Sequence, residues 1–360
     1  MKKNLLMLCA FIASFTLKAK EINYKNHSPR PVVGSYYVEG AKKTLPPNKI
    51  KYQLLSHIFH AFAVPKDDGS ITQISNDIVK EAHKNNTRVI ISVGGGGYKK
   101  FAKITNNKKT YKNLIQSLIL LVKNNDYDGI DIDWEFPENK IEGQNWNKLM
   151  TDLRSELDKL SQQSNRLYEL TTALPVGKWC GKWISREVIL KNIDFINLMA
   201  YDGLEWQAGY HSPLFADKND PKKIAFSNWD YWWNENKIPK SKLTFGVPFY
   251  TYVFESIKPY TKLPNYNGGR QVAYQKFLNR MKKEGGYTSY ESTENLATWY
   301  FSADKKVFAA VDTPKTIAFK TNWAVKKMKF TGVFSWALHH EYDKSNQNFP
   351  LTEAMKKASE

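Results

Sequence analysis

Residues 128–135 read Asp-Gly-Ile-Asp-Ile-Asp-Trp-Glu and have the two-residue period of a β-strand. Asp131, Asp133 and Glu135 fall on one face, where successive side chains lie roughly 7 Å apart, and the other face is apolar. Like charges this close on a half-buried strand cannot all ionise, so we expect at least one pKa to rise. Such an arrangement costs stability, but it suits a site that needs a carboxylic acid protonated near neutral pH. The alternative is a solvated edge strand, which the apolar alternation disfavours.

Short apolar segments with the character of strands recur along the whole chain, and most are separated by stretches of helical period such as 111–124, 146–162 and 315–328. Eight alternations of strand and helix predict the α/β class, with a parallel sheet closed into a (β/α)8 TIM barrel. An open, doubly wound sheet is the alternative, but eight repeats and the lack of a Gly-x-Gly-x-x-Gly motif disfavour it. The predicted strands are residues 32–37, 57–63, 87–93, 128–134, 168–174, 194–200, 243–249 and 331–337.

About 80 residues separate the seventh and eighth predicted strands, far more than one helix needs. We predict that residues 252–310 form a small α+β insertion between strand 7 and helix 7, with one helix at 271–283. The barrel would then comprise residues 28–251 and 311–358. Long excursions on the carboxyl-terminal face of a barrel usually wall a binding cleft.

The amino terminus reads as a secretory signal peptide over residues 1–19, since Met1-Lys2-Lys3 precedes an apolar run that is too short to span a bilayer. We therefore expect a secreted or periplasmic protein. The residues before Cys9 lack the small residue of a lipoprotein signal, so we expect no membrane anchor. After cleavage only Cys180 would remain, and the fold would rest on its core without an internal disulfide.

The chain is basic, with a formal net charge of +18, but its lysines are dispersed and no nucleic-acid-binding motif accompanies them. We expect no nucleic-acid partner; a proteome rich in lysine or attraction to anionic cell surfaces explains the charge. His57, His60 and the pair His339-His340 do not have the spacing of metal ligands, so no metal or other cofactor is expected. The absence of Pro/Ser-rich linkers and tandem repeats argues against an appended binding module, and we expect a monomer.

Asp128-x-x-Asp131-x-Asp133-x-Glu135 resembles the DxxDxDxE signature of family 18 glycoside hydrolases, the chitinase family. The resemblance extends in order over residues 31 to 345. It is also carried by Ser92-Val93-Gly94-Gly95, Met199-Ala200-Tyr201-Asp202, Trp206, Ser212-Pro213-Leu214, Gly246-Val247-Pro248-Phe249-Tyr250 and Trp336. One departure is clear: where the family's seventh strand often continues Phe-Tyr-Gly-Arg, this chain has Phe249-Tyr250-Thr251-Tyr252, and the arginine is missing.

The resemblance implies a retaining hydrolase that cleaves β-1,4 bonds between N-acetylglucosamine units of chitin or chitooligosaccharides, with an endo mode of action. In this family the 2-acetamido group of the substrate replaces a protein nucleophile and an oxazolinium ion forms. Glu135 would protonate the leaving oxygen, and Asp133 would orient the acetamide. Asp131 would share a proton with Asp133.

The resemblance also implies roles for residues outside this strand. Tyr201 would donate its hydroxyl to the acetamide oxygen, and Trp336 would form the floor beneath the sugar. Ser92 would support Asp131, with a strand-end turn hydroxyl as the alternative, and Asp128 would support the base of the strand. Further substrate contacts are expected from Asp202, Met199 (or core packing), Tyr36, Phe62, Gly94, Gly95, Trp206 and Tyr250.

Two other functions stay open from the sequence. A non-catalytic chitin lectin would keep the barrel and lose the acid, whereas Glu135 and Asp133 are both present here. An enzyme of the same chemistry could act on the chitobiose core of N-glycans as an endo-β-N-acetylglucosaminidase, or on a peptidoglycan-like polymer. Aromatic residues in strand-end loops, such as Trp179 and Trp183, predict sugar stacking in all these cases.

Overall fold

The computed structural model describes residues 28–72, 74–204, 207–218, 220, 225–228, 231–255, 259–263, 269–292 and 296–360. The predicted signal peptide, residues 1–19, lies outside these ranges. No helix within them is long and apolar enough to cross a membrane. Cys180 is buried and unpaired, and burial raises the pKa of its thiol to about 12.

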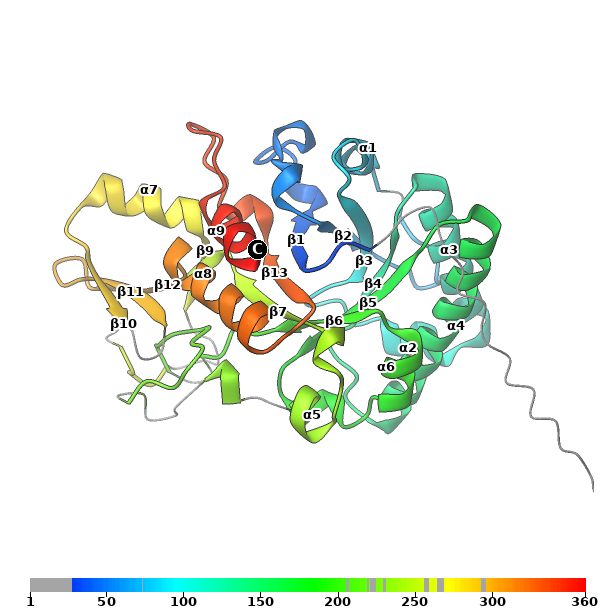
Figure 1. The fold of residues 1–360 in the computed structure, drawn as a ribbon. Helices are drawn as coiled ribbons and strands as arrows, with labels where there is room; N and C mark the ends of the chain where they lie inside the picture. The colour runs from blue at the N-terminus through cyan, green and yellow to red at the C-terminus, as the bar shows by residue number, and fades with distance from the viewer. Residues whose placement is uncertain are drawn as a thin grey trace, which may run out of the picture.

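Eight parallel strands close into a barrel in the order β1-β13-β7-β6-β5-β4-β3-β2 (Figure 1). This confirms the predicted (β/α)8 class, and every observed strand ends within one residue of its predicted bounds. The strands are β1 (Val32–Val38), β2 (His57–Ala63), β3 (Arg88–Gly94), β4 (Gly129–Asp133), β5 (Glu169–Pro175), β6 (Phe195–Met199), β7 (Leu243–Pro248) and β13 (Gly332–Trp336).

Helices cover the outside of the barrel, and their apolar stripes pack against the outward-facing strand residues. The 18-residue α3, for example, is capped by the Asn107 side chain and buries Leu114, Leu118 and Leu121 on one face. The helices of this layer are α1 (Asp77–His83), α2 (Phe101–Asn106), α3 (Lys108–Asn125), α4 (Lys140–Ser164), α5 (Lys178–Gly181), α6 (Arg186–Asn192), α8 (Pro314–Asn322) and α9 (Pro350–Ser359).

Two connections in the described ranges replace the expected α-helix with tighter or wider turns. Between β1 and β2 the chain makes three 3-10 turns, Glu39–Ala41, Pro47–Lys49 and Tyr52–Leu54, in a stretch where Pro46 and Pro47 lack the N–H groups that a longer helix would need. Before β7 a π-helical turn holds Trp232, which is fully buried and donates to the Pro175 carbonyl at 2.8 Å. This tryptophan packs in the core.

A second, antiparallel sheet follows β7, with the strand order β10-β11-β12-β8-β9. It stands to one side of the barrel in Figure 1, opposite α3 and α4 in that view, and it carries α7 (Tyr274–Glu284). This is an α+β insertion between the seventh barrel strand and the helix after it. Its strands are β8 (Tyr250–Glu255), β9 (Arg270–Ala273), β10 (Thr288–Ser292), β11 (Ala297–Ser302) and β12 (Val307–Val311).

The predicted helix at 271–283 begins later than expected. Residues 270–273 form β9 instead, since they pair with β8 in the register Thr251 to Val272. Tertiary pairing therefore overrides the helical pattern at this end. The exact domain bounds, 28–251 with 311–358 and 252–310, stay a prediction.

The two faces of β4 have the predicted parity. Ile130 and Ile132 belong to the large apolar cluster between strands and helices. Asp131 and Asp133 are buried on the other face, in the interior of the barrel. Because β4 ends at Asp133, Glu135 comes just after the carboxyl end of the strand, which is where barrel enzymes place their active sites.

Candidate active site

A cavity of about 250 Å³ opens at the carboxyl ends of the barrel strands. It is lined by residues from the first strand to the last, so the closure of the barrel brings distant parts of the chain together. Nine of the lining residues were predicted from the sequence: Tyr36, Phe62, Asp133, Glu135, Met199, Tyr201, Asp202, Tyr250 and Trp336. The others are Gly96, Ala173 and Gln271.

Asp131 lies beneath this cavity and accepts three hydrogen bonds. Tyr36 and Ser92 donate to Oδ2 at 2.9 and 2.8 Å, and Thr171 donates to Oδ1 at 2.7 Å. Burial raises the pKa of Asp131, while these donors oppose the rise. The predicted contact between Ser92 and Asp131 is present, and the three donors fix the carboxylate within the barrel.

Asp133 is buried, and its Oδ1 has no hydrogen-bond partner among the described residues. Burial, then the charge of Glu135, then that of Asp131 raise the pKa of Asp133 well above its usual range. The resemblance implies that Asp131 shares a proton with Asp133, and the charges of both Glu135 and Asp131 act on the Asp133 carboxyl group. Asp131 itself is held by three hydroxyl donors. A buried carboxylate oxygen without a partner is ready to accept a donor from a ligand.

Glu135 lines the same cavity as Asp133 and lies two residues beyond it, just after β4 ends. Burial and then the charge of Asp202 raise the pKa of Glu135 to about 7, although Lys99 opposes the shift. Lys99 also donates to the main-chain oxygen of Glu135 at 3.3 Å. A carboxylic acid with this pKa is substantially protonated at neutral pH, which general acid catalysis requires.

Tyr201, Asp202 and Tyr250, which follow β6 and β7, form another part of the cavity wall. The Tyr250 hydroxyl donates to Oδ1 of Asp202, and the Tyr201 and Tyr250 rings meet edge to face at 6.1 Å. Burial, then Asp133 and Asp202, raise the pKa of Tyr201 well above its usual value. The Tyr201 hydroxyl therefore keeps its proton and can donate it to an acceptor in the cavity.

Aromatic rings surround the base of the cavity. Trp336 stacks on Phe62 with the ring centroids 5.6 Å apart and contacts Tyr36 at 5.4 Å. An indole held in this way offers a flat apolar face to a pyranose ring. The geometry suits the predicted role of Trp336 as the floor under a sugar.

The glycines after β3 differ in their roles. Gly94 and Gly95 have φ of 108° and 92°; a Cβ on Gly94 would lie 2.4 Å from the Asp133 carbonyl oxygen, and one on Gly95 2.5 Å from the Phe62 ring. These two glycines permit close packing behind the cavity wall and do not line the cavity, which departs from their expected role as substrate contacts. Gly96 lies at the wall, with its Cβ position 3.4 Å from Oε1 of Glu135.

The remaining predicted residues lie away from the cavity or outside the described ranges. Asp128, at the amino end of β4, accepts hydrogen bonds from His83 and Arg166 and supports the base of the strand. Trp206 lies outside the described residues. Ala173 could have been found by parity, since it shares the inward face of β5 with Thr171. Gln271 lies on β9 of the insertion, and no sequence motif predicts that it lines the cavity.

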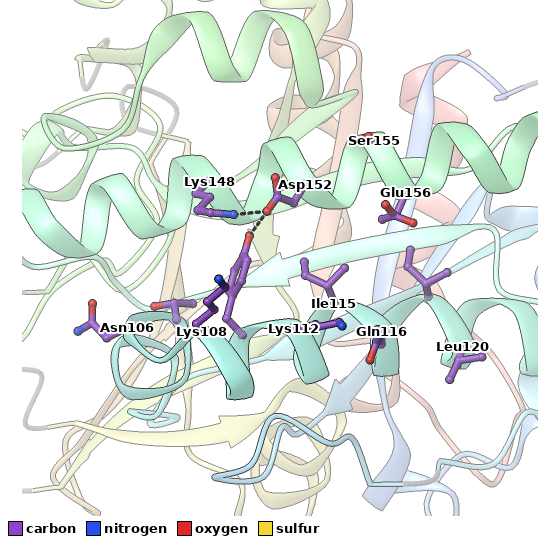
Figure 2. Close-up of a pocket in the computed structure, with 13 residues that line it drawn as sticks. Asn106, Lys108, Lys112, Ile115, Gln116, Leu120, Lys148, Asp152, Ser155 and Glu156 are labelled. Carbon is purple, nitrogen blue, oxygen red and sulfur yellow. Dashed lines mark hydrogen bonds and ion pairs between the residues drawn. The ribbon is translucent and has the colours of Figure 1, made fainter.

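A larger hollow, about 1100 Å³, lies on the outer wall between α3 and α4 (Figure 2). Its polar groups pair with one another: Tyr111 donates to Asp152 at 2.6 Å, and Lys148 also pairs with Asp152 and lies 4.4 Å from the Tyr111 ring. It lies away from the ends of the barrel strands and lacks a converging set of carboxyl groups. We therefore place the chemistry in the smaller cavity. In the part of the chain that the structure describes, no His, Cys, Asp and Glu side chains group to hold a metal ion.

Comparison with known proteins gives the family. Residues 32–341 match the family described as Glycosyl hydrolases family 18. Chitinase 1 from Aphanocladium album is 27% identical over 270 residues, which cover 72% of this chain and 63% of that protein. An endochitinase from Manduca sexta is 24% identical over 349 residues, which cover 86% of this chain and 61% of the relative. The chain thus spans less than two thirds of the length of these two curated relatives.

A solved structure agrees with the fold. A mutant of the class V chitinase from Nicotiana tobaccum in complex with NAG4 superposes with a TM-score of 0.78, over 91% of this chain and 98% of the other, at 21% identity. The likeness extends over the closed barrel. The family match covers β4, with Asp131 and Asp133, and Glu135 just after it. This chain belongs to family 18 of the glycosyl hydrolases.

Proposed function

We propose that the protein is a chitinase that hydrolyses β-1,4 bonds between N-acetylglucosamine units with retention and with an endo mode of action. The observation that carries the proposal is Glu135, an acid with a pKa of about 7 that shares a cavity with the buried Asp133 and the Trp336 indole. The chitinase relatives and the NAG4 complex of a structural neighbour support a chitooligosaccharide substrate.

In the first step the sugar lies over Trp336 with its 2-acetamido group directed toward Asp133 and Tyr201. The acetamide oxygen attacks the anomeric carbon of the same sugar while Glu135 gives its proton to the glycosidic oxygen, and the bond to the leaving sugar breaks. Asp133 accepts the acetamide N–H and stabilises the positive oxazolinium ion, and the Tyr201 hydroxyl donates to the acetamide oxygen.

In the second step Glu135, now ionised, takes a proton from water. The water oxygen attacks the anomeric carbon from the side that the leaving group vacated, and the oxazolinium ring opens to restore the acetamide. Two displacements at one carbon give net retention of configuration. The acid is protonated again at the end of the cycle.

Catalysis is favoured over a lectin function by the charges in the cavity. A binding protein gains nothing from two carboxyl groups in one cavity whose pKa values are raised by burial and by nearby carboxylates, Glu135 and Asp131 for Asp133 and Asp202 for Glu135. A proton donor and an electrostatic partner for a cation are what the hydrolysis needs. The chitobiose core of N-glycans remains the alternative substrate, because both substrates would present the same acetamido sugar to this cavity.

An exposed aromatic pair supports binding of a polymer. The Trp179 side chain, on the short helix α5 after β5, is 53% exposed and meets the Phe136 ring edge to face at 4.7 Å. Phe136 directly follows Glu135 in the sequence, so the ring contact connects Trp179 to the residue after the acid. An endo-acting enzyme needs sugar contacts beyond the sugar that is cleaved, and Trp179 offers one.

The test compares substrates. Chitin oligosaccharides should be cleaved and a thiazoline analogue of the oxazolinium ion should inhibit competitively, while cellulose oligosaccharides of equal length, which lack the acetamide, should be inert. Cleavage of a high-mannose glycoprotein at a rate above that of chitotetraose would move the assignment to the N-glycan substrate. Binding of chitotetraose without any turnover would make the protein a lectin.

We also propose that residues 1–19 direct export to a secreted or periplasmic location and that the exported protein is a monomer. The positive start and the apolar run of the sequence support this. Amino-terminal sequencing of the exported protein should begin at Lys20, and light scattering should give the mass of one chain. A mature protein that keeps Met1 would contradict the export proposal.

A further inference from the structure

His211, in the loop after β6, is buried without an evident partner for its imidazole. Its exposed fraction is 1%, and neither ring nitrogen has a hydrogen-bond partner among the described residues. Its position is fixed by the main chain, since the Gly203 N–H donates to the His211 carbonyl at 2.8 Å. A buried polar side chain in this state costs folding free energy and calls for an explanation.

Tyrosine rings pack around the imidazole and leave it facing a carboxylate. Tyr250 lies 5.1 Å and Tyr252 5.0 Å from the ring of His211, centroid to centroid. Nδ1 of His211 lies 3.8 Å from Oδ1 of Asp202, the oxygen that also accepts from Tyr250.

The gap to Asp202 is a little longer than a hydrogen bond and can close. The Asp202 side chain is 38% exposed and lines the cavity, so it has room to turn when a sugar enters. Catalytic hydrogen bonds are often long in a free enzyme and shorten in the substrate complex. His211 itself is not among the residues that line the cavity, so its effect on substrate must pass through a neighbour that does, and Asp202 is the neighbour that faces an imidazole nitrogen.

We propose that His211 is a positioning residue whose Nδ1–H donates to Oδ1 of Asp202 in the substrate complex. With Tyr250 and His211 both donating to Oδ1, Oδ2 is turned to the sugar, and part of the Asp202 charge is drawn away from Glu135. This deepens the proposed hydrolase function and rests on it. The alternative is that His211 only fills space between two tyrosines.

A matched pair of variants separates these two roles. Asparagine and leucine have nearly the same size and shape, and only asparagine carries an N–H donor close to the place of Nδ1. His211→Leu should lower kcat on a chromogenic chitobioside by about tenfold with little change in KM, while His211→Asn should keep most of the activity. Thermal unfolding of both variants shows whether they fold equally well.

The same pair in an Asp202→Asn background tests whether His211 acts through Asp202. If it does, the kcat difference between the leucine and asparagine variants should disappear there, because the effects of coupled residues are not additive. Equal losses from the two variants, or a difference that persists without the Asp202 carboxylate, would overturn the proposal. A wild-type protein that cleaves no acetamido sugar substrate would overturn the proposed function instead.

A second measurement does not need turnover. Nitrogen-15 spectra of the histidine side chains, with His211 assigned from the His211→Asn variant, report which ring nitrogen carries the hydrogen. We expect it on Nδ1, with a shift of that resonance in Asp202→Asn. A hydrogen on Nε2 alone would overturn the role of His211, because Nδ1 could not then donate.

Discussion

The two ends of β4 carry the same kind of residue in opposite states. At the amino end, burial alone would raise the pKa of Asp128, but the hydrogen bond from His83 and the charge of Arg88 hold it below its usual value. At the carboxyl end, burial and nearby carboxylates raise the pKa values of Asp133 and Glu135, and among the described residues only Lys99 opposes the shift, at Glu135.

The next strand repeats the pattern of the amino end. Glu169 is buried at the start of β5 and is held by Arg88 at 2.7 Å and His57 at 3.0 Å, and its pKa lies well below the usual range despite its burial. Carboxylates that are paired with cations at one end of the barrel stabilise the fold. Carboxyl groups without such partners at the other end have raised pKa values, which proton transfer requires. This division matches the rule that barrel enzymes keep stability and catalysis on opposite faces.

The largest expected effect is a loss of activity without a loss of folding, from a substitution at the carboxyl end of β4. Glu135→Gln should lose at least about a hundredfold in kcat on chitin oligosaccharides, because the amide cannot give a proton to the leaving oxygen. Folding, seen by circular dichroism, and binding of chitotetraose, seen by calorimetry, should persist. Glu138→Gln, at an exposed position three residues further on, is the control and should be fully active. Near-normal turnover of Glu135→Gln would remove Glu135 from the role of acid.

The second prediction sets the two ends of β4 against each other. Asp133→Asn should lower kcat by about tenfold or more and raise the stability near pH 7, since it removes a buried carboxylate whose ionisation opposes folding. Asp128→Asn should leave kcat of the folded protein nearly unchanged but lower the unfolding free energy by about 3 kcal/mol, since His83 and Arg166 lose their charged partner. Urea unfolding and kcat at saturating substrate measure both. Equal losses of activity from the two variants would show that the two ends do not differ in role.

The sequence predicts which face of β4 each carboxylate lies on, but not the hydrogen-bond partners of those carboxylates. The parity of β4, read from alternating residues, correctly separates Asp131 and Asp133 from Ile130 and Ile132, because strand geometry is local. The three donors to Asp131 come from β1, β3 and β5, and only barrel closure and register bring them together. Gln271 was missed for the same reason: β9 reaches the cavity through its pairing with β8.

The third prediction concerns pH and follows from the opposite pKa shifts. Glu135 must be protonated to act, so kcat should fall as the pH rises through about 7. Asp128 and Glu169 have lowered folded pKa values, so their stabilisation is complete above their unfolded pKa values, about 3.9 and 4.3, and is lost as the pH falls through the folded values. Activity should therefore decline first on the alkaline side, where the melting temperature is still high. A melting temperature that falls together with kcat near pH 7 would contradict this separation.

The smallest expected effect is on the binding of long oligosaccharides and comes from Trp179, outside the cavity. It compares the charged groups at the end of β4 with an uncharged aromatic contact. Trp179→Ala should weaken binding of chitohexaose by about fivefold, the scale of one aromatic contact, and leave kcat and KM on a chromogenic chitobioside nearly unchanged, because that substrate ends within the cavity. Tyr290→Ala is the matched control, since Tyr290 is also an exposed aromatic residue, 45% exposed, but lies on β10 of the insertion. Calorimetry in the Glu135→Gln background measures the affinities without turnover. An equal loss from both variants would mean that aromatic surface in general binds the polymer, and a loss on the chitobioside would mean that Trp179 acts on the chemical step through Phe136, next to the acid.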